Sequence, residues 1–282
     1  MKTIYYYQSF VGLEKALENI TDIDVIIVSS IHFGKDNEER FSAQLDPERR
    51  EQRALSDSAY IHLNDNVPTD SIFDKLWMET KEASVQGCKI MVMMGGAGYA
   101  YRQLFSDFDM YYPMLREMIR ERPWISGIDL DIEEETTLEN VQMLIRRLVD
   151  DFGPDFTITM APISTSLESD GGSMGGFNYK TLYNSEEGKH ISWFHTQCYY
   201  SFSKNTYDKI IQNGYPPEKI VMGMESGQFT KDTFQNALQE VHNIITEYPT
   251  MAGVFDWEYL DAPPDEKDPS KWASLMKSCS TI

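Results

Sequence analysis

The sequence has few cysteines, no long apolar run and no recognisable leader. The three cysteines in 282 residues, Cys88, Cys198 and Cys279, are too few for a disulfide framework, and an odd number cannot all be paired. No CxxC or Cys/His spacing indicates a zinc site. No apolar run reaches the roughly 18 residues needed to cross a bilayer. The start, MKTIYYYQSF, lacks the apolar segment of a signal peptide. We therefore expect a cytoplasmic protein if the chain is full length, and a secreted one if a leader has been removed.

Basic residues are also scarce. The chain has 25 Lys and Arg against 45 Asp and Glu, which gives a formal net charge of −20. Nucleic acids and anionic membranes are bound by basic patches, so neither is expected as a partner. An acidic surface would suit a neutral or cationic ligand, but it more often only keeps a protein soluble. We expect a monomer with no cofactor and no metal.

Short apolar runs recur along the chain with helix-like stretches between them. Most are continuous and rich in branched side chains, as in a parallel sheet that is covered on both faces. These predicted strands are residues 3–10, 24–33, 89–96, 125–133, 156–163, 191–200, 219–226 and 251–259.

Eight strand–helix alternations in one chain predict a single (β/α)₈ TIM barrel that spans residues 1–282 as one domain. A doubly wound open sheet is the rival, but no GxGxxG turn follows the first strand. The longest irregular stretches, 34–70 and 164–190, follow the carboxyl ends of strands, where a barrel carries its active-site loops. Only about 25 residues join the last two strands, so no α+β module is inserted there.

The segment SGIDLDIEEE places Asp129, Asp131 and Glu133 at every second position, with apolar residues between them. On a strand, these three acids share one face. In a barrel the apolar face packs under the helices, so the acids must point inward, and at least one pKa is expected to rise. Two alternatives are a surface strand with solvated acids and a divalent-metal site. The other strand ends offer Met, Gln, Tyr and Trp, which are poor ligands for a hard cation.

Five motifs in barrel order resemble glycoside hydrolase family 18, the chitinases and endo-β-N-acetylglucosaminidases. The segment GIDLDIE is similar to the family's strand-4 motif DGxDxDxE, and the other four are VMMGG, TMAP, QCYY and GVFDWEY. There are two departures. Ser126 stands where the family motif has its first Asp, and Tyr200 stands where Asn or Asp is usual.

The resemblance implies a retaining mechanism in which the substrate's own acetamido group is the nucleophile. Glu133 would be the general acid and then the base. Asp131 would orient the acetamido nitrogen and stabilise the oxazolinium ion, and Asp129 would share a proton with Asp131. Tyr199 would donate its hydroxyl to the acetamido carbonyl oxygen, with Gln197 beside it.

Further residues are candidates for binding the sugar. Trp257 would form an apolar floor under the reacting sugar, although ordinary barrel core is the alternative. Tyr7, Met160 and Glu225 could line the same pocket, with core packing at least as good an explanation. Gly95 and Gly96 would let the backbone approach the sugar, unless they only form a turn.

The resemblance implies hydrolysis of β-1,4 bonds between N-acetylglucosamine units. The partner would be an oligosaccharide or polysaccharide that contains N-acetylglucosamine, either chitin or the chitobiose core of N-glycans. A catalytically weak, lectin-like carbohydrate-binding protein is the alternative, because barrels of this family also serve in binding.

Overall fold

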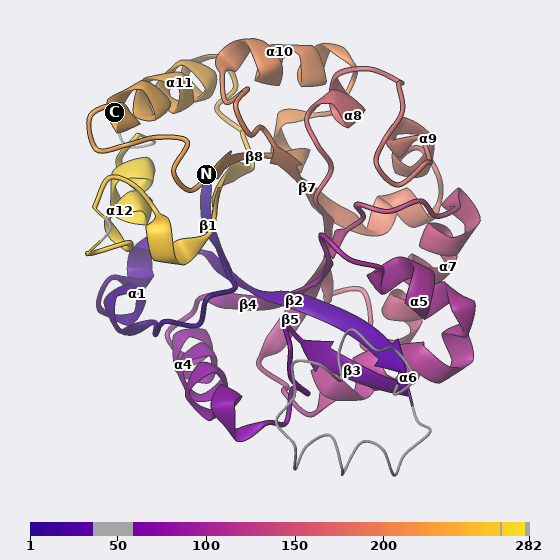
Figure 1. The fold of residues 1–282 in the computed structure, drawn as a ribbon. Coiled ribbons are helices and arrows are strands. Elements are labelled where there is room, and N and C mark those ends of the chain that lie inside the picture. Colours follow the sequence, from indigo (N-terminus) through magenta and orange to yellow (C-terminus); the bar gives the residue numbers. More distant parts are fainter. Residues whose placement is uncertain (36–58, 266, 280–282) are drawn as a thin grey trace.

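Eight parallel strands close into a barrel that is surrounded by helices (Figure 1), as seen in a computed structural model that describes residues 1–35, 59–265 and 267–279. The sheet closes because β1 pairs with both β2 and β9. The barrel strands are β1 (Lys2–Tyr7), β2 (Val25–Lys35), β4 (Lys89–Gly95), β5 (Ile125–Asp131), β6 (Thr157–Met160), β7 (Ile191–Gln197), β8 (Ile220–Glu225) and β9 (Gly253–Trp257). Each predicted strand corresponds to one of these, so the predicted TIM barrel is confirmed.

Amphipathic helices cover the outside of the barrel. In α7, Val141, Leu144, Ile145 and Leu148 recur at helical spacing and are fully buried, and the Thr137 side chain caps the first turn. The α-helices are α1 (Glu14–Glu18), α4 (Asp74–Val85), α5 (Ala100–Ser106), α6 (Phe108–Arg120), α7 (Leu138–Phe152), α8 (Thr165–Glu168), α9 (Tyr179–Tyr183), α10 (Lys204–Gln212), α11 (Phe234–Glu247) and α12 (Lys271–Ser278). Short 3₁₀ helices are η1 (Ile20–Asp22), η2 (Ser71–Phe73), η3 (Glu187–His190), η4 (Pro217–Lys219) and η5 (Tyr259–Asp261).

The connection between β8 and β9 carries one α-helix, α11, and no inserted module, as predicted. Within the described part of the chain, no helix is long and apolar enough to cross a membrane.

One strand was not predicted. β3 (Ala59–Leu63) pairs antiparallel with the long strand β2 outside the barrel, in the stretch 34–70 that the sequence pattern indicated to be irregular. Residues 36–58 of that stretch lie outside the described residues. β3 is short, and its sequence AYIHL has no clean alternation of polar and apolar residues. It pairs with the carboxyl end of β2, and the two strands together project away from the barrel (Figure 1).

Alternation along the strands separates two cores. On β1, Tyr5 and Tyr7 face the helices, and Tyr6 faces the barrel interior. The interior is filled by large side chains from several strands, among them Met91, Trp193 and Phe255. Because this filling occupies the barrel, polar groups that point inward near the carboxyl ends of the strands form the floor of a pocket.

Candidate active site

The acidic segment of β5 is built as the alternation predicts. Ile128 and Leu130 are fully buried against the helices, and Asp129 and Asp131 are buried on the other face. β5 lies between the parallel strands β4 and β6, so the alternative of a solvated surface strand is wrong. The carboxylates are therefore held inside the barrel, with Glu133 just beyond the end of the strand.

Asp129, Asp131 and Glu133 form an acidic stack that leads up toward the mouth of the barrel. Asp129 lies at the bottom of this stack and is fully buried. Its Oδ2 accepts a hydrogen bond of 2.7 Å from the Tyr6 hydroxyl. Its Oδ1 accepts one of 2.6 Å from the Thr159 hydroxyl and one of 2.9 Å from Nδ1 of His195. Three donors from three other strands thus converge on one carboxylate.

His195 was not among the predicted site residues, because histidines do not cluster in the sequence. The indole Nε1 of Trp193, which can only donate, lies 2.7 Å from Nε2 of His195. Nε2 must therefore accept, and the proton of a neutral imidazole is on Nδ1, where it is donated to Asp129. Both His195 and Trp193 point into the barrel from β7, and the signal that could have found them is their alternation with Gln197 along that strand.

Asp131 is the next acid up the stack, with 5% of its surface exposed. Burial raises the pKa of Asp131 well above its usual range, and the nearby charges of Glu133 and Asp129 raise it further. A hydrogen bond of 3.1 Å from the Gln197 amide to Oδ1 acts in the opposite direction. Because three donors occupy Asp129, we assign the proton of this acidic pair to Asp131.

Glu133 is half-buried in the wall of a cavity of about 260 Å³. The Gln197 amide lies 3.3 Å from Oε1 of Glu133 and is itself fixed by the carbonyl of Ala161 at 2.9 Å. Gln197 therefore links the last two acids of the stack. The cavity is also lined by Gln8, Ser30, Met93, Gly95, Gly96, Ala97, Asp131, Tyr199, Glu225 and Trp257.

Tyr199 and Trp257 lie where the sequence predicts, in the wall of this cavity. Burial raises the pKa of Tyr199 well above its usual range, with smaller contributions from Asp131 and other acids, so its hydroxyl keeps its proton and can donate. The Trp257 ring packs on Tyr6 at 5.2 Å between centroids. It is half-buried and is the only tryptophan of the five that lines the cavity.

Solved structures similar to the chain share this fold over its whole length. A fungal endo-β-N-acetylglucosaminidase from glycosyl hydrolase family 18 matches with a TM-score of 0.80 at 28% identity, covering 99% of this chain and 98% of that one. A chitinase from Aspergillus fumigatus matches with a TM-score of 0.78 at 29% identity, covering 100% and 99%. The chain is therefore similar, over its whole length, to glycosidases of family 18.

A further match is to the fold alone. A family 18 chitinase from Pseudoalteromonas aurantia has a TM-score of 0.72 at 19% identity, covering 99% of this chain and 100% of that one. No family model and no curated protein matches the sequence. The predicted resemblance to family 18 is confirmed by the first two structures, whereas the roles of individual residues stay predictions.

Two predicted pocket residues lie elsewhere. Tyr7 is buried among the helices, where its hydroxyl accepts a hydrogen bond from the Gly12 amide at 2.7 Å. Met160 is fully buried in the same outer core. Both predictions were wrong because each picks the outward-facing residue of its strand. Tyr6 and Thr159, one position earlier, are the inward residues that support the acids.

Gly95, the last residue of β4, and Gly96 directly after it both contact β5. Gly95 has φ of +103°, and a Cβ atom there would lie 2.1 Å from the carbonyl oxygen of Asp131. The Gly96 amide donates to that same carbonyl at 2.9 Å. These glycines line the cavity and also let β4 approach the acidic strand closely. Glu225 lines the cavity from β8, as predicted, with its role untested.

The two departures from the family 18 pattern lie away from the acids. Ser126 is at the opposite end of β5 from Glu133, and its hydroxyl bonds to the Ile90 carbonyl at 3.3 Å. Tyr200 is 84% exposed and has φ of +58°, a conformation that Asn and Asp adopt more readily. Within the described residues, no group of three or more His, Cys, Asp or Glu side chains is arranged to hold a metal ion.

Proposed function

We propose that the chain hydrolyses β-1,4 bonds between N-acetylglucosamine units, with retention of configuration and with the substrate's acetamido group as nucleophile. The observation that supports this most is the acidic stack of β5, in which a buried Asp131 lies between a fully hydrogen-bonded Asp129 and a half-exposed Glu133. The similarity to a chitinase and to an endo-β-N-acetylglucosaminidase supports the same class of substrate.

Glu133 would supply the proton in the first step. Protonated Glu133 gives its proton to the glycosidic oxygen, and the bond from that oxygen to C1 breaks. The acetamido carbonyl oxygen of the same sugar attacks C1 and forms a cyclic oxazolinium ion. In the second step the Glu133 carboxylate takes a proton from water, the water oxygen attacks C1, and the ring opens.

The neighbours of Glu133 stabilise what forms between these steps. Asp131, whose raised pKa gives it a proton in the free enzyme, would lose that proton as the positive ring develops, and its carboxylate would then accept a hydrogen bond from the acetamido N–H. Asp129 would take the proton that Asp131 releases, in place of one of the three hydrogen bonds that Asp129 accepts in the free enzyme. The Tyr199 hydroxyl would hold the acetamido oxygen in line with C1, and Trp257 would support the apolar face of the sugar.

A rival mechanism uses a second protein carboxylate. Glu225 lines the same cavity from β8, which is three strands from β5 around the barrel, and is half-buried. It could in principle attack C1 and form a covalent glycosyl enzyme. Asp131 is less suited to that role, because it is buried and protonated.

The first experiment is Glu133→Gln, measured on a fluorogenic chitotrioside and on a glycopeptide. The change removes the proton donor and keeps the shape, and general acid catalysis contributes roughly 10²–10⁴-fold, so we expect kcat to fall by at least 10²-fold with folding intact. Glu135→Gln is the matched control, because Glu135 is exposed two residues further along the chain. A Glu133→Gln enzyme with more than about a tenth of the wild-type rate would refute the assignment.

The second experiment separates the two nucleophiles. A thiazoline analogue of an N-acetylglucosamine oligomer resembles the cyclic intermediate and should inhibit competitively. A 2-fluoro glycoside lacks the acetamido group and traps an enzyme that uses a protein carboxylate. Mass spectrometry after incubation should find no adduct, and an adduct on Glu225 would instead establish the rival mechanism.

A further inference from the structure

Glu258 directly follows Trp257 at the end of β9, and its side chain reaches back to the end of β1. Its Oε2 accepts hydrogen bonds of 3.0 Å from the backbone amides of both Gln8 and Ser9. Its Oε1 accepts one of 2.8 Å from the amide of Leu260, in η5. One carboxylate therefore joins the segments that follow the first and the last strand of the barrel.

The peptide that joins Trp257 to Glu258 is held by Ser226, the first residue after β8. The carbonyl of Trp257 accepts a hydrogen bond from the Ser226 amide. The amide of Glu258 donates to Oγ of Ser226 at 2.9 Å. In the sheet, β9 lies between β8 and β1. The backbone at Trp257 is therefore bonded to the end of β8 through Ser226 and to the end of β1 through the side chain of Glu258.

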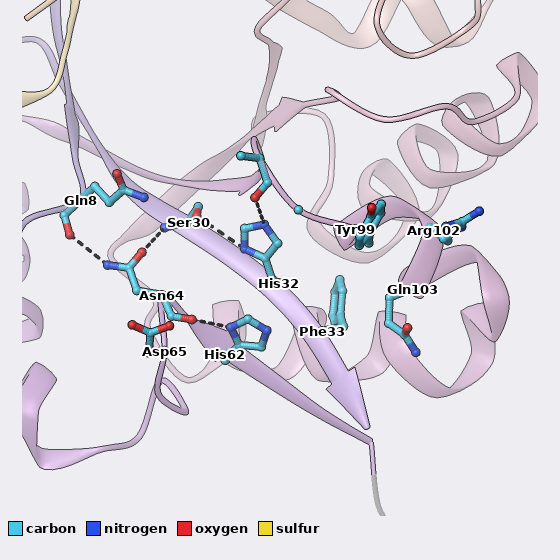
Figure 2. A pocket seen from close by; sticks show the side chains of 12 residues that line it. Gln8, Ser30, His32, Phe33, His62, Asn64, Asp65, Tyr99, Arg102 and Gln103 are labelled. Carbon is cyan, nitrogen blue, oxygen red and sulfur yellow. Dashed lines mark hydrogen bonds between the residues drawn. The ribbon is translucent and has the colours of Figure 1, made fainter. Parts of the chain in front are cut away.

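Gln8 is held at both of its main-chain groups. Its amide donates to Glu258, and its carbonyl accepts from Nδ2 of Asn64 at 2.9 Å (Figure 2). Oδ1 of Asn64 in turn accepts from the Ser30 amide at 3.2 Å (Figure 2). Gln8 lines the cavity beside Trp257 and also a neighbouring pocket of about 710 Å³. The segment that Glu258 binds is therefore itself fixed to β2.

The ring of Trp257 has few other contacts that could set its position. It is half-buried, and among the described residues its indole nitrogen has no hydrogen-bond partner. Within the same part of the chain, Tyr6 is the one aromatic ring that it packs on, at 5.2 Å between centroids. A ring that is held by few side chains takes its position largely from its backbone, which the hydrogen bonds of Glu258 fix.

We propose that Glu258 is a positioning residue for Trp257, and that it holds the indole plate where the sugar binds. This rests on the proposed function, in which Trp257 supports the apolar face of the sugar. Glu258 is not among the residues that line the cavity, so it acts through Trp257 and not on the substrate. The alternative is a local role as the N-cap residue of η5.

The test uses a variant that keeps the cap and loses the bond to β1. Serine is a favoured N-cap residue, so Glu258→Ser can still accept from Leu260, but its side chain is too short to reach Gln8 or Ser9. We expect kcat/KM on a fluorogenic chitotrioside to fall about tenfold, as for other coupled neighbours. Glu258→Gln should recover much of this loss, because its amide oxygen can accept from both amides. Wild-type rates in Glu258→Ser would leave only the cap and overturn the proposal.

A double-mutant cycle shows whether the effect passes through the indole ring. In a Trp257→Ala background the ring is absent, so adding Glu258→Ser should change kcat/KM by less than about twofold. Equal losses in the two backgrounds would mean that Glu258 acts elsewhere, and would overturn the proposal.

Glu240→Ser is the matched control. Glu240 is also half-buried and also accepts from a backbone amide, that of Lys204 at 2.5 Å, but it lies on α11 outside the barrel. This variant should leave kcat and KM unchanged. Thermal unfolding of both serine variants separates a loss of activity from a loss of folded protein.

Quenching of tryptophan fluorescence by acrylamide, in the free protein, distinguishes failure of this proposal from failure of the proposed function. The contribution of Trp257 is the difference between each chain and the same chain with Trp257→Phe. We expect Trp257 to become more accessible to acrylamide in Glu258→Ser and to be unchanged in Glu240→Ser. A chain that cuts no substrate yet shows this pattern would lose the proposed function and keep the positioning role. Unchanged quenching in Glu258→Ser would overturn the positioning role.

Discussion

At the scale of single residues, the side chains that donate hydrogen bonds to Asp129 are as specific as the acids themselves. Asp129 is reached by donors from β1, β6 and β7, and the donor on β7 is His195. Trp193 fixes which nitrogen of His195 carries the proton. We expect these supporting residues to set where the proton of the acidic pair is held, and so to affect catalysis without touching the sugar.

His195 can be tested as a positioning residue by two substitutions. His195→Phe keeps a buried ring and removes the donor to Asp129, and a hydrogen bond to a charged group is worth about 1.5–3 kcal/mol. We expect kcat to fall about tenfold or more with little change in KM. The limb of the pH–rate profile that reports the acidic pair should move to higher pH, because the charged pair has lost a donor.

His195→Asn is the rescue variant, since an amide NH₂ can take the place of Nδ1–H. It should recover much of the rate and return the pH profile toward that of wild type. If the Asn and Phe variants were equally slow with the same profile, His195 would be a packing residue only. Thermal unfolding of both variants separates this from general loss of folded protein.

Trp257 gives a second prediction at this scale. Trp257→Phe keeps an aromatic plate and most of the volume, so the chain should fold. We expect kcat as well as affinity to fall, because contact with the sugar matters most as its ring distorts toward the transition state. The change in tryptophan fluorescence on adding a chitooligosaccharide should also vanish, since no other tryptophan lines the cavity. Unchanged kinetics and fluorescence would leave Trp257 as core.

At the scale of elements, the close approach of β4 and β5 holds the acids in place. Gly95→Ala would put a Cβ atom 2.1 Å from the Asp131 carbonyl oxygen, so the end of β5 must shift at Asp131. We expect the variant to lose most activity and a few kcal/mol of stability, as measured by rates and by urea unfolding. The loss of stability combines this clash with the strain of a left-handed φ at a residue that is not glycine, whereas the loss of activity follows from the shift of β5.

Gly87→Ala is the matched control for backbone strain. Gly87 also has a left-handed φ, of +97°, but a Cβ atom there would meet nothing within 4 Å. This variant should lose about 1 kcal/mol of stability and no activity. If Gly95→Ala behaved the same way, contact with β5 would not be what requires glycine at that position.

The elements also show what the sequence could and could not reveal. Each barrel strand was predictable because buried parallel strands are continuous apolar runs, and the acids of β5 broke that pattern visibly. Tyr7 and Met160 were placed in the pocket by nearness to strand ends, whereas their outward direction depends on register. The pocket of about 710 Å³ that β3 and the residues after it help to line could not be predicted, because it depends on a short strand and on Asn64, which bonds to Ser30 and Gln8 far away in the sequence.

At the scale of the whole molecule, stability should depend on two buried acids. Burial raises the pKa of Asp131 and of Asp256 well above the usual range. A hydrogen bond from Ser226 at 2.8 Å acts against this at Asp256, but Asp256 is fully buried and the shift stays upward. Both acids hold a proton in the folded chain that the unfolded chain releases above about pH 4.

The sign of the pH dependence follows from this. Below the unfolded pKa of about 3.9, both states are protonated and the stabilising contribution is complete. As pH rises toward the raised folded pKa, the contribution of each acid falls by about 1.4 kcal/mol per pH unit. Self-repulsion at a net charge of −20 lowers the stability in the same direction, so a wild-type curve alone cannot separate the two effects.

Asp256→Asn separates them, because the amide is neutral at every pH and can still accept from Ser226. Urea unfolding at pH 5, 6 and 7 should show the stability of wild type falling relative to the variant by up to about 1.4 kcal/mol per unit. Salt at 0.5 M should flatten the part of both curves that comes from surface charge and leave their difference nearly unchanged, because a buried group is screened much less. Parallel curves for wild type and variant would mean that Asp256 is ionised in the folded protein.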